Sequence, residues 1–195
     1  MVVIGIVAAI LGYALGARGD SGKDLVATGN GATATTAVSI PVRSFPSGSG
    51  GSPTSPIPFR QAGNPSGVQW TVRVTDTNAD AYAAVRPADP LGNKPPAAGQ
   101  QFVMVSVELT YNGTGSESPS SVDLLAVGQT NYVYRPSRDS CGVIPTRYSD
   151  GRSVRSGETV RGNVCWSVKT EDLPTLVLIA QAQQADRDQL YFALR

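Results

Sequence analysis

The sequence predicts an all-β protein in which one antiparallel β-sandwich follows an apolar N-terminal segment and a disordered linker. Three observations support this fold class. Residues 1–17 carry no charge, and residues 18–66 are rich in Gly, Ser, Thr, Ala and Pro. Regular alternation of apolar and polar residues begins only after Gly67. The sandwich is therefore assigned to residues 67–195, a length that suits one domain with a core of its own.

The apolar segment, from Met1 to Ala17, has the character of a membrane anchor or a signal sequence. As a helix it would extend about 25 Å, short of a hydrocarbon core of roughly 30 Å. Neither Lys nor Arg precedes it, although both kinds of segment normally follow a basic flank. We therefore expect the printed start to fall inside a longer apolar segment.

The charges that follow the segment, Arg18 and Lys23, would by themselves favour a C-terminal domain on the cytoplasmic side. A basic flank before the apolar segment, which we expect in a longer chain, would reverse that orientation. We expect a single-pass membrane protein whose C-terminal domain is extracytoplasmic. The alternative is secretion after cleavage, because Ala14 and Gly16 have the small-residue spacing that a signal peptidase reads.

The linker, residues 18–66, lacks any sustained apolar period. Its Pro, Ser and Gly content is too high, and its apolar content too low, to offset the entropy lost on folding. We expect a disordered tether that separates the sandwich from the membrane.

The alternating segments define the strands of the sandwich. In residues 68–75 the side chains of Val68, Trp70, Val72 and Val74 face one way and polar side chains the other, as in a half-buried strand. About seven such strands with turn signals between them, and no βαβ rhythm, indicate an antiparallel sandwich. The remaining strands are expected at residues 103–111, 121–127, 132–134, 159–169, 175–182 and 189–194.

Turn and helix signals fit this order of strands. Asn112-Gly113 ends one strand and Ser156-Gly157 precedes another. The one helix we expect is short, over residues 80–85, and Pro87 limits its extension.

The two cysteines are expected to form a disulfide, Cys141–Cys165, because the N-terminus indicates export to an oxidising compartment. The alternative is two free thiols. In the strand over residues 159–169, Cys165 shares its face with polar residues and Trp166 shares the other face with valines. The bridge would therefore pin the loop over residues 134–151 to the polar side of the sheet. The bridge would close a loop of about two dozen residues, between Cys141 and Cys165, which corresponds to about 3 kcal/mol of stabilisation.

Three stretches carry a resemblance to a known family. They are the strand Gly-Gln-Gln-Phe-Val-Met-Val-Ser-Val-Glu-Leu-Thr-Tyr-Asn-Gly from Gly99, the strand Ser-Gly-Glu-Thr-Val-Arg-Gly-Asn-Val-Cys-Trp-Ser-Val from Ser156, and the closing Leu-Tyr-Phe-Ala-Leu. They resemble telokin-like, immunoglobulin-fold domains of a domain-of-unknown-function family of exported bacterial proteins. The chain is also similar to a secreted mycobacterial immunoprotective antigen.

This resemblance implies an immunoglobulin-like sandwich, export and an actinobacterial source. The excess of Arg over Lys in an Ala/Gly/Val-rich chain is usual for GC-rich genomes. The family has no established catalytic residues that could be transferred to this sequence.

Chemistry-bearing motifs are absent from the sequence. It contains no His, which excludes Ser-His-Asp and Cys-His nucleophile systems and His-ligated zinc. Asp76, Asn78 and Asp80 have the spacing that opens a calcium loop, but Ala81 and Pro87 replace the residues such a loop requires, so a surface turn is favoured. We expect no cofactor, no metal and no enzymatic activity. A hydrolase that uses carboxylates alone is the remaining enzymatic alternative.

The overall charge gives no reason to expect a nucleic-acid partner. The net charge is +1 and charged residues make up 16% of the chain, so no broad field attracts phosphates.

One segment has the composition of a binding surface. Tyr and Arg combine apolar contact with directed hydrogen bonds and are enriched at binding hot spots. The alternative is a solvated Arg-rich loop with Tyr rings packed on the sheet edge. The candidate residues are Tyr132, Tyr134, Arg135, Arg138, Arg147 and Tyr148.

We therefore expect a non-enzymatic, membrane-tethered, extracytoplasmic protein-binding module, such as an accessory subunit of an envelope membrane complex. Its partners would be the membrane, through residues 1–17, and an envelope protein. The alternative function is a carrier or sensor for a small envelope ligand, a lipid or glycan fragment, held between the sheets or at a loop end.

Overall fold

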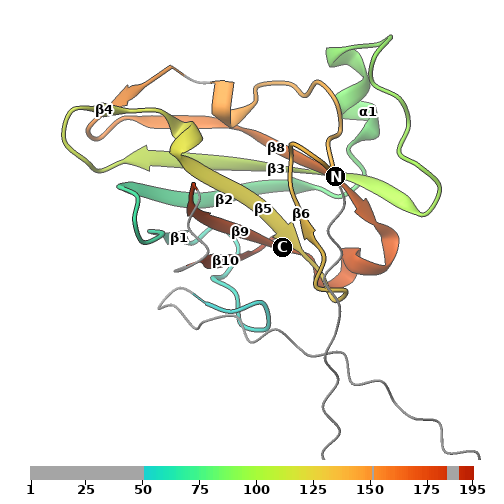
Figure 1. The fold of residues 1–195 in the computed structure, drawn as a ribbon, viewed down its shortest axis with the longest axis horizontal. Coiled ribbons are helices and arrows are strands. Elements are labelled where there is room, and N and C mark those ends of the chain that lie inside the picture. Colours follow the sequence, from blue (N-terminus) through green and yellow to red (C-terminus); the bar gives the residue numbers. More distant parts are fainter. Residues whose placement is uncertain (1–50, 151, 184–188) are drawn as a thin grey trace, which may run out of the picture. The chain divides into compact units, whose positions relative to one another are not determined.

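The predicted antiparallel β-sandwich is confirmed. A computed structural model describes residues 51–150, 152–183 and 189–195, so the predicted membrane segment and residues 18–50 of the predicted tether lie outside the described residues. Two four-stranded sheets form the sandwich, and a two-stranded ribbon lies at one end of it (Figure 1). Sheet one has the order β1 (Ala62–Gly63), β2 (Trp70–Asn78), β3 (Gln100–Tyr111), β8 (Thr159–Lys169). Sheet two has the order β10 (Leu190–Ala193), β9 (Val177–Ala182), β5 (Val122–Val127), β6 (Val133–Tyr134), and the ribbon pairs β4 (Ser116–Glu117) with β7 (Val154–Arg155).

Short helices connect the strands. The predicted helix is confirmed as α1 (Tyr82–Val85), continued by the 3₁₀ turn η1 (Arg86–Ala88) that contains Pro87. No helix in the described part of the chain is long and apolar enough to cross a membrane. The other helical turns are η2 (Pro119–Ser121), η3 (Tyr148–Asp150) and η4 (Thr170–Thr175).

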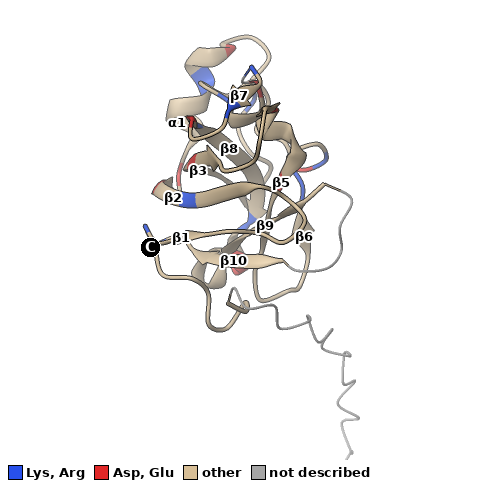
Figure 2. Ribbon diagram, turned by 90° about the vertical axis from the view of Figure 1, so that its left-hand side faces the viewer, with Lys and Arg blue, Asp and Glu red and all other residues tan. Residues whose placement is uncertain are grey.

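The main core lies between the two sheets, where the predicted alternation places it. Trp70 and Trp166 are fully buried in it. Trp70 donates a hydrogen bond from Nε1 to Ser121 Oγ at 2.9 Å, so its polar edge is satisfied. Charged residues are scattered over the module (Figure 2).

A second, smaller core covers the outer face of sheet one. The sequence predicted a polar face there, and residues such as Arg161 and Lys169 are indeed exposed. Cys165, however, is buried among apolar side chains, because α1 and the disulfide-bonded loop cover this end of the strand pair. The members of this cluster are Ala81, Val85, Phe102, Cys141, Ile144 and Cys165.

The folded module begins earlier than residue 67, so the predicted tether is wrong for residues 51–66. The Ile57 amide donates to Tyr191 O at 2.7 Å, and the Ala193 amide donates to Ile57 O at 2.8 Å. A few residues later, β1 pairs with β2. The segment therefore pairs first with an edge of sheet two and then with an edge of sheet one. Its prolines do not prevent this, because Pro is tolerated where a strand lies at the edge of a sheet.

Replacing Ile57 with Ala tests whether this segment is part of the fold. Ile57 packs against the main core as a partly buried residue. We expect the Ile57→Ala variant to lose about 1–2 kcal/mol of unfolding free energy, below the roughly 2–5 kcal/mol of a fully buried Ile. The control is Thr54→Ala, an exposed position in the same segment, with an expected change within about 0.5 kcal/mol. Equal stabilities of the two variants in urea denaturation would show that residues 51–66 are a tether.

Candidate functional site

Two loops on the outer face of sheet one enclose a groove. The first loop, residues 86–99, connects α1 to β3, and the second, residues 135–147, lies between β6 and β8. We call the hollow between them the two-loop groove. Its volume is about 410 Å³. Its lining consists of Gly92, Asn93, Lys94, Pro95, Pro96, Ala97, Gln100, Phe102, Arg138, Asp139, Ser140, Cys141, Gly142 and Ser167.

The predicted Cys141–Cys165 disulfide is confirmed and holds the second loop against β8. The Cα atoms of the two cysteines are 5.8 Å apart. On either side of the bridge the loop bonds to the same strand. The Ser167 amide donates to Asp139 O at 2.7 Å, and the Asn163 amide donates to Thr146 O at 2.7 Å. The second loop is therefore attached to β8 at three successive places.

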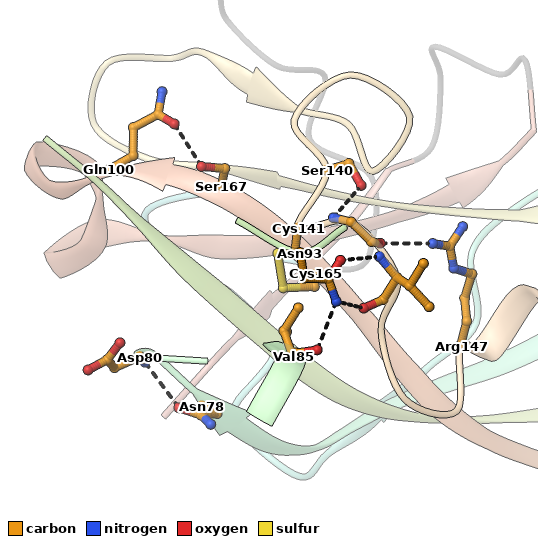
Figure 3. The surroundings of a disulfide bond; sticks show 12 residues. Asn78, Asp80, Val85, Asn93, Gln100, Ser140, Cys141, Arg147, Cys165 and Ser167 are labelled. Atoms are coloured by element: carbon orange, nitrogen blue, oxygen red, sulfur yellow. Dashed lines mark hydrogen bonds between the residues drawn. A yellow bond between two sulfur atoms is a disulfide. The ribbon is translucent and has the colours of Figure 1, made fainter. Parts of the chain in front are cut away.

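Asn93 joins the two loops to each other. Its buried side chain donates from Nδ2 to Val85 O at 2.8 Å and to Val143 O at 2.7 Å. The Val143 amide donates back to Asn93 Oδ1 at 2.9 Å (Figure 3). Gly142 has φ +87°, and a Cβ there would overlap Asn93 Oδ1. No sequence signal predicted these Asn93 hydrogen bonds, because nothing in a Pro/Gly-rich loop distinguishes a buried Asn from an exposed one.

Tyr132 and Arg138, two of the predicted binding residues, lie together beside the groove. The Arg138 guanidinium is 4.7 Å from the centre of the Tyr132 ring. Tyr132 donates its hydroxyl to Asp139 Oδ1 at 2.9 Å, and this bond raises the pKa of Tyr132. Arg138 pairs with Asp139 at 3.2 Å, which raises the pKa of the guanidinium. These contacts hold an aromatic ring and a cation in one fixed arrangement.

Tyr134 and Tyr148 are buried, which does not fit their prediction as partner-binding residues, although Tyr148 also lines a hollow described below. Tyr134 donates to Asp172 Oδ2 at 2.6 Å, and Asp172 is itself fully buried. Tyr148 donates to Val122 O at 2.9 Å. Burial raises the pKa of both phenols well above the usual value. Both rings belong to the main core, because each hydroxyl finds an acceptor inside the protein.

Arg135 and Arg147 are exposed but line a different hollow, of about 420 Å³. Asp123 also lines it, and burial raises the pKa of this carboxyl, with Arg135 opposing the shift. Tyr148 lines this hollow as well, so the hollow brings together three of the six predicted residues. Tyr132 and Arg138 lie at the two-loop groove, and Tyr134 lies in the core.

Three exposed apolar residues adjoin or contact residues that line the two-loop groove. The large hydrophobic residues that are exposed in the described part of the chain are Leu91 (85%), Val143 (50%) and Tyr132 (37%). Leu91 adjoins Gly92 of the groove lining, and Val143 adjoins Gly142 of the lining. Tyr132 contacts Arg138, which lines the groove. Leu91 and Val143 were not among the predicted binding residues, although an isolated apolar residue in a Pro/Gly-rich loop is a signal that could have identified them.

The described residues offer no metal centre. In those ranges no group of three His, Cys, Asp or Glu side chains is placed to hold a metal ion. At the calcium-like spacing, the Asp80 amide donates to Asn78 Oδ1 at 3.0 Å, which closes a local turn.

The chain is similar to solved structures whose functions their names do not give. One is an uncharacterized β-sandwich protein from Clostridium difficile 630, at 8% identity and TM-score 0.45, covering 72% of this chain and 95% of that one. A conserved hypothetical protein from Bacillus anthracis matches at 12% identity and TM-score 0.42, covering 69% and 94%. The yjhA protein from Bacillus subtilis matches at 10% identity and TM-score 0.43, covering 71% and 99%. No protein-family model matches the chain, and no curated protein matches it.

Replacing Asn93 with Leu tests the tie between the loops. The variant leaves Val85 O and both backbone groups of Val143 without the partner they have now. We expect a loss of about 2–3 kcal/mol in unfolding free energy, since each unpaired, desolvated group is costly. Asn64→Leu is the matched control, because Asn64 is exposed and makes a surface hydrogen bond. Unchanged stability of the Asn93→Leu variant in urea denaturation would show that the two loops are not joined in this way.

Proposed function

We propose that this chain is a non-enzymatic protein-binding module, tethered to a membrane on its extracytoplasmic side, and that the two-loop groove is its partner surface. The observation that carries the proposal is the position of Leu91, Val143 and Tyr132. Leu91 and Val143 each adjoin, in the chain, a residue that lines one groove, and Tyr132 contacts Arg138, which lines the same groove. Grouped exposed apolar residues with a polar rim are typical of protein-interaction sites.

The composition of the groove border favours a protein partner. Tyr and Arg are enriched among residues that contribute most to binding. The Tyr132–Arg138 pair presents a ring and a guanidinium that are already positioned by Asp139. Leu91 on the first loop and Val143 on the second add exposed aliphatic area, which a partner could cover and desolvate.

The internal bonds of the two loops support the same proposal. A loop that is ordered before binding loses less conformational entropy when it meets a partner. Cys141–Cys165 attaches the second loop to β8, and Asn93 attaches the first loop to the second. The groove border therefore needs little reorganisation to bind.

The location is inferred from the disulfide and the N-terminal sequence. Structural disulfides persist in oxidising, extracytoplasmic compartments. Residues 1–17 have the composition of an anchor, with a secreted form as the alternative. The resemblance to telokin-like domains of exported bacterial proteins, and to a secreted mycobacterial antigen, supports this location. An accessory subunit of an envelope membrane complex is the role that such a tethered module fits.

Photo-crosslinking tests the proposed surface. A photoreactive residue is placed at position 91 or 143 of the full chain in cells that make the protein, with position 114 as the control. Thr114 is exposed and follows the end of β3 at Tyr111, whereas Gln100, at the other end of β3, lines the groove. We expect one shared envelope protein to crosslink from positions 91 and 143 and not from position 114. Equal crosslinking from position 114, or different products from positions 91 and 143, would contradict the proposal.

The double variant Leu91→Asp/Val143→Asp then tests affinity for that partner. Two carboxylates in place of exposed apolar contacts should weaken binding by about tenfold or more. Because both side chains are exposed, the melting temperature should stay near that of the parent. Thr114→Asp is the control and should bind like the parent. Unchanged affinity of the double variant would place the partner surface elsewhere.

A further inference from the structure

The outer face of sheet two is apolar, although the outer face of an antiparallel sheet in a two-layer sandwich commonly meets water. Alternation along β5, β9 and β10 sends every second residue into the main core and its neighbours to the opposite side. Ile179 is paired in register with Leu125 on one side and with Tyr191 on the other, so these three side chains form a row across three strands. We call this surface the sheet-two outer face. Its cluster consists of Leu125, Val127, Val177, Ile179 and Tyr191, with Val133 packed against them.

This face is buried, although every member of its cluster comes from sheet two itself. The five members each expose 6% of their surface or less. They lie on β5, β9 and β10, and Val133 lies on β6. Side chains on one face of a sheet stand side by side and point away from the backbone, so they do not cover one another's ends. Burial also raises the pKa of Tyr191 to about 12. Burial of this extent requires a segment that crosses the face.

The described chain begins at an edge of this face. The two backbone hydrogen bonds of Ile57 place its segment alongside β10, the edge strand of sheet two. Just before it, Pro53 and Thr54 line a hollow of about 590 Å³ together with Val127 and Val177 of the cluster. The first described residues therefore reach the rim of the sheet-two outer face without filling the space over it.

Residues 43–50 are close enough in the chain to cross the face. One compact unit of the chain runs from Arg43 to Arg195. Phe45 is the large apolar residue nearest to Gly51, and it is the only aromatic residue between positions 18 and 50. Six residues extend up to about 20 Å, whereas four neighbouring strands span roughly 15 Å. Phe45 can therefore reach any strand of the face. Residues 184–188, which join β9 to β10, read Gln-Ala-Asp-Arg-Asp and supply no large apolar side chain.

We propose that residues 43–50 cross the sheet-two outer face and that the Phe45 ring packs on the row formed by Leu125, Ile179 and Tyr191. An aromatic side chain can bury about 150–250 Å², which makes Phe45 the residue of this segment best suited to cover the row. The tether would then join the module on the side opposite to the two-loop groove, which lies on the outer face of sheet one. The proposal does not depend on the groove, so either can fail without the other.

Nuclear Overhauser effects in the full chain test the contact directly. With the methyl groups of Leu125, Val177 and Ile179 labelled, we expect cross-peaks between these methyls and an aromatic ring that vanish in the Phe45→Ala variant. A sample that mixes labelled and unlabelled copies distinguishes the occupants, because a contact within one chain gives no cross-peak between copies. Absence of the Phe45 cross-peaks, or their presence only between copies, would overturn the proposal.

A water-soluble paramagnetic probe tests whether this segment is the cover. In the parent, the methyl resonances of Leu125 and Ile179 should stay sharp. In the Phe45→Ala variant they should broaden, and the equilibrium constant for unfolding in urea should rise about tenfold or more, because a buried ring is lost. The control is Leu25→Ala, which removes a large apolar side chain elsewhere in residues 18–50 and should behave like the parent. Broadening in the parent would show an open face. That result, parent-like behaviour of Phe45→Ala, or equal effects of the two variants would overturn the proposal.

Discussion

The pairing of β3 with β8 is the constraint on which the rest of the structure depends. The two strands pair from Gln100↔Lys169 to Thr110↔Thr159 without interruption. Their inner face, with Val105 and Trp166, contributes to the main core. Their outer face, with Phe102 and Cys165, contributes to the second core. A strand pair buried on both faces over part of its length has one register available, because a slip by one residue would exchange the two faces.

The candidate partner surface is built on that strand pair. Cys165 lies on the outer face of β8, and its disulfide with Cys141 attaches the second loop to that face. Asn93 then fixes the first loop to the second through Val143. The exposed residues Leu91 and Val143 are consequently carried by backbone that is bonded to buried structure. Exposure of apolar side chains on such supported loops is what distinguishes this surface from an ordinary mobile loop.

The sequence pattern predicted the strands of the sandwich well, but it did not predict which loops and segments pack on them. Alternation holds in β3, in β8 and in β2 as far as Val74, because one face of each is apolar there; a register shift after Val74 interrupts it in β2. The same alternation placed Cys165 on the face of its strand opposite to Trp166. It therefore predicted that the disulfide lies outside the main core. The strand pairing of the segment around Ile57 was not predicted, because its partner Phe192 is distant in the sequence and the segment has few apolar residues.

Only part of the candidate site could be predicted, because residue types do not show which loops come together in space. Tyr and Arg are equally suited to a binding surface and to a core or surface role, and composition alone does not separate these. Tyr134 can be buried because its hydroxyl donates a hydrogen bond to Asp172. Tyr148 can be buried because its hydroxyl donates to Val122 O. Neither acceptor is near in sequence. The groove itself requires two loops from distant parts of the chain, and a one-dimensional pattern contains no trace of it.

Hydrogen exchange at the Val143 amide tests the central claim, that the two loops are ordered before any partner binds. In the free, oxidised protein this amide donates to Asn93 Oδ1 beside an exposed side chain. We expect it to be protected by several orders of magnitude relative to an unstructured amide, and reduction of Cys141–Cys165 should remove most of that protection. Exchange of the Val143 amide at the rate of an unstructured loop in the free, oxidised protein would contradict the account.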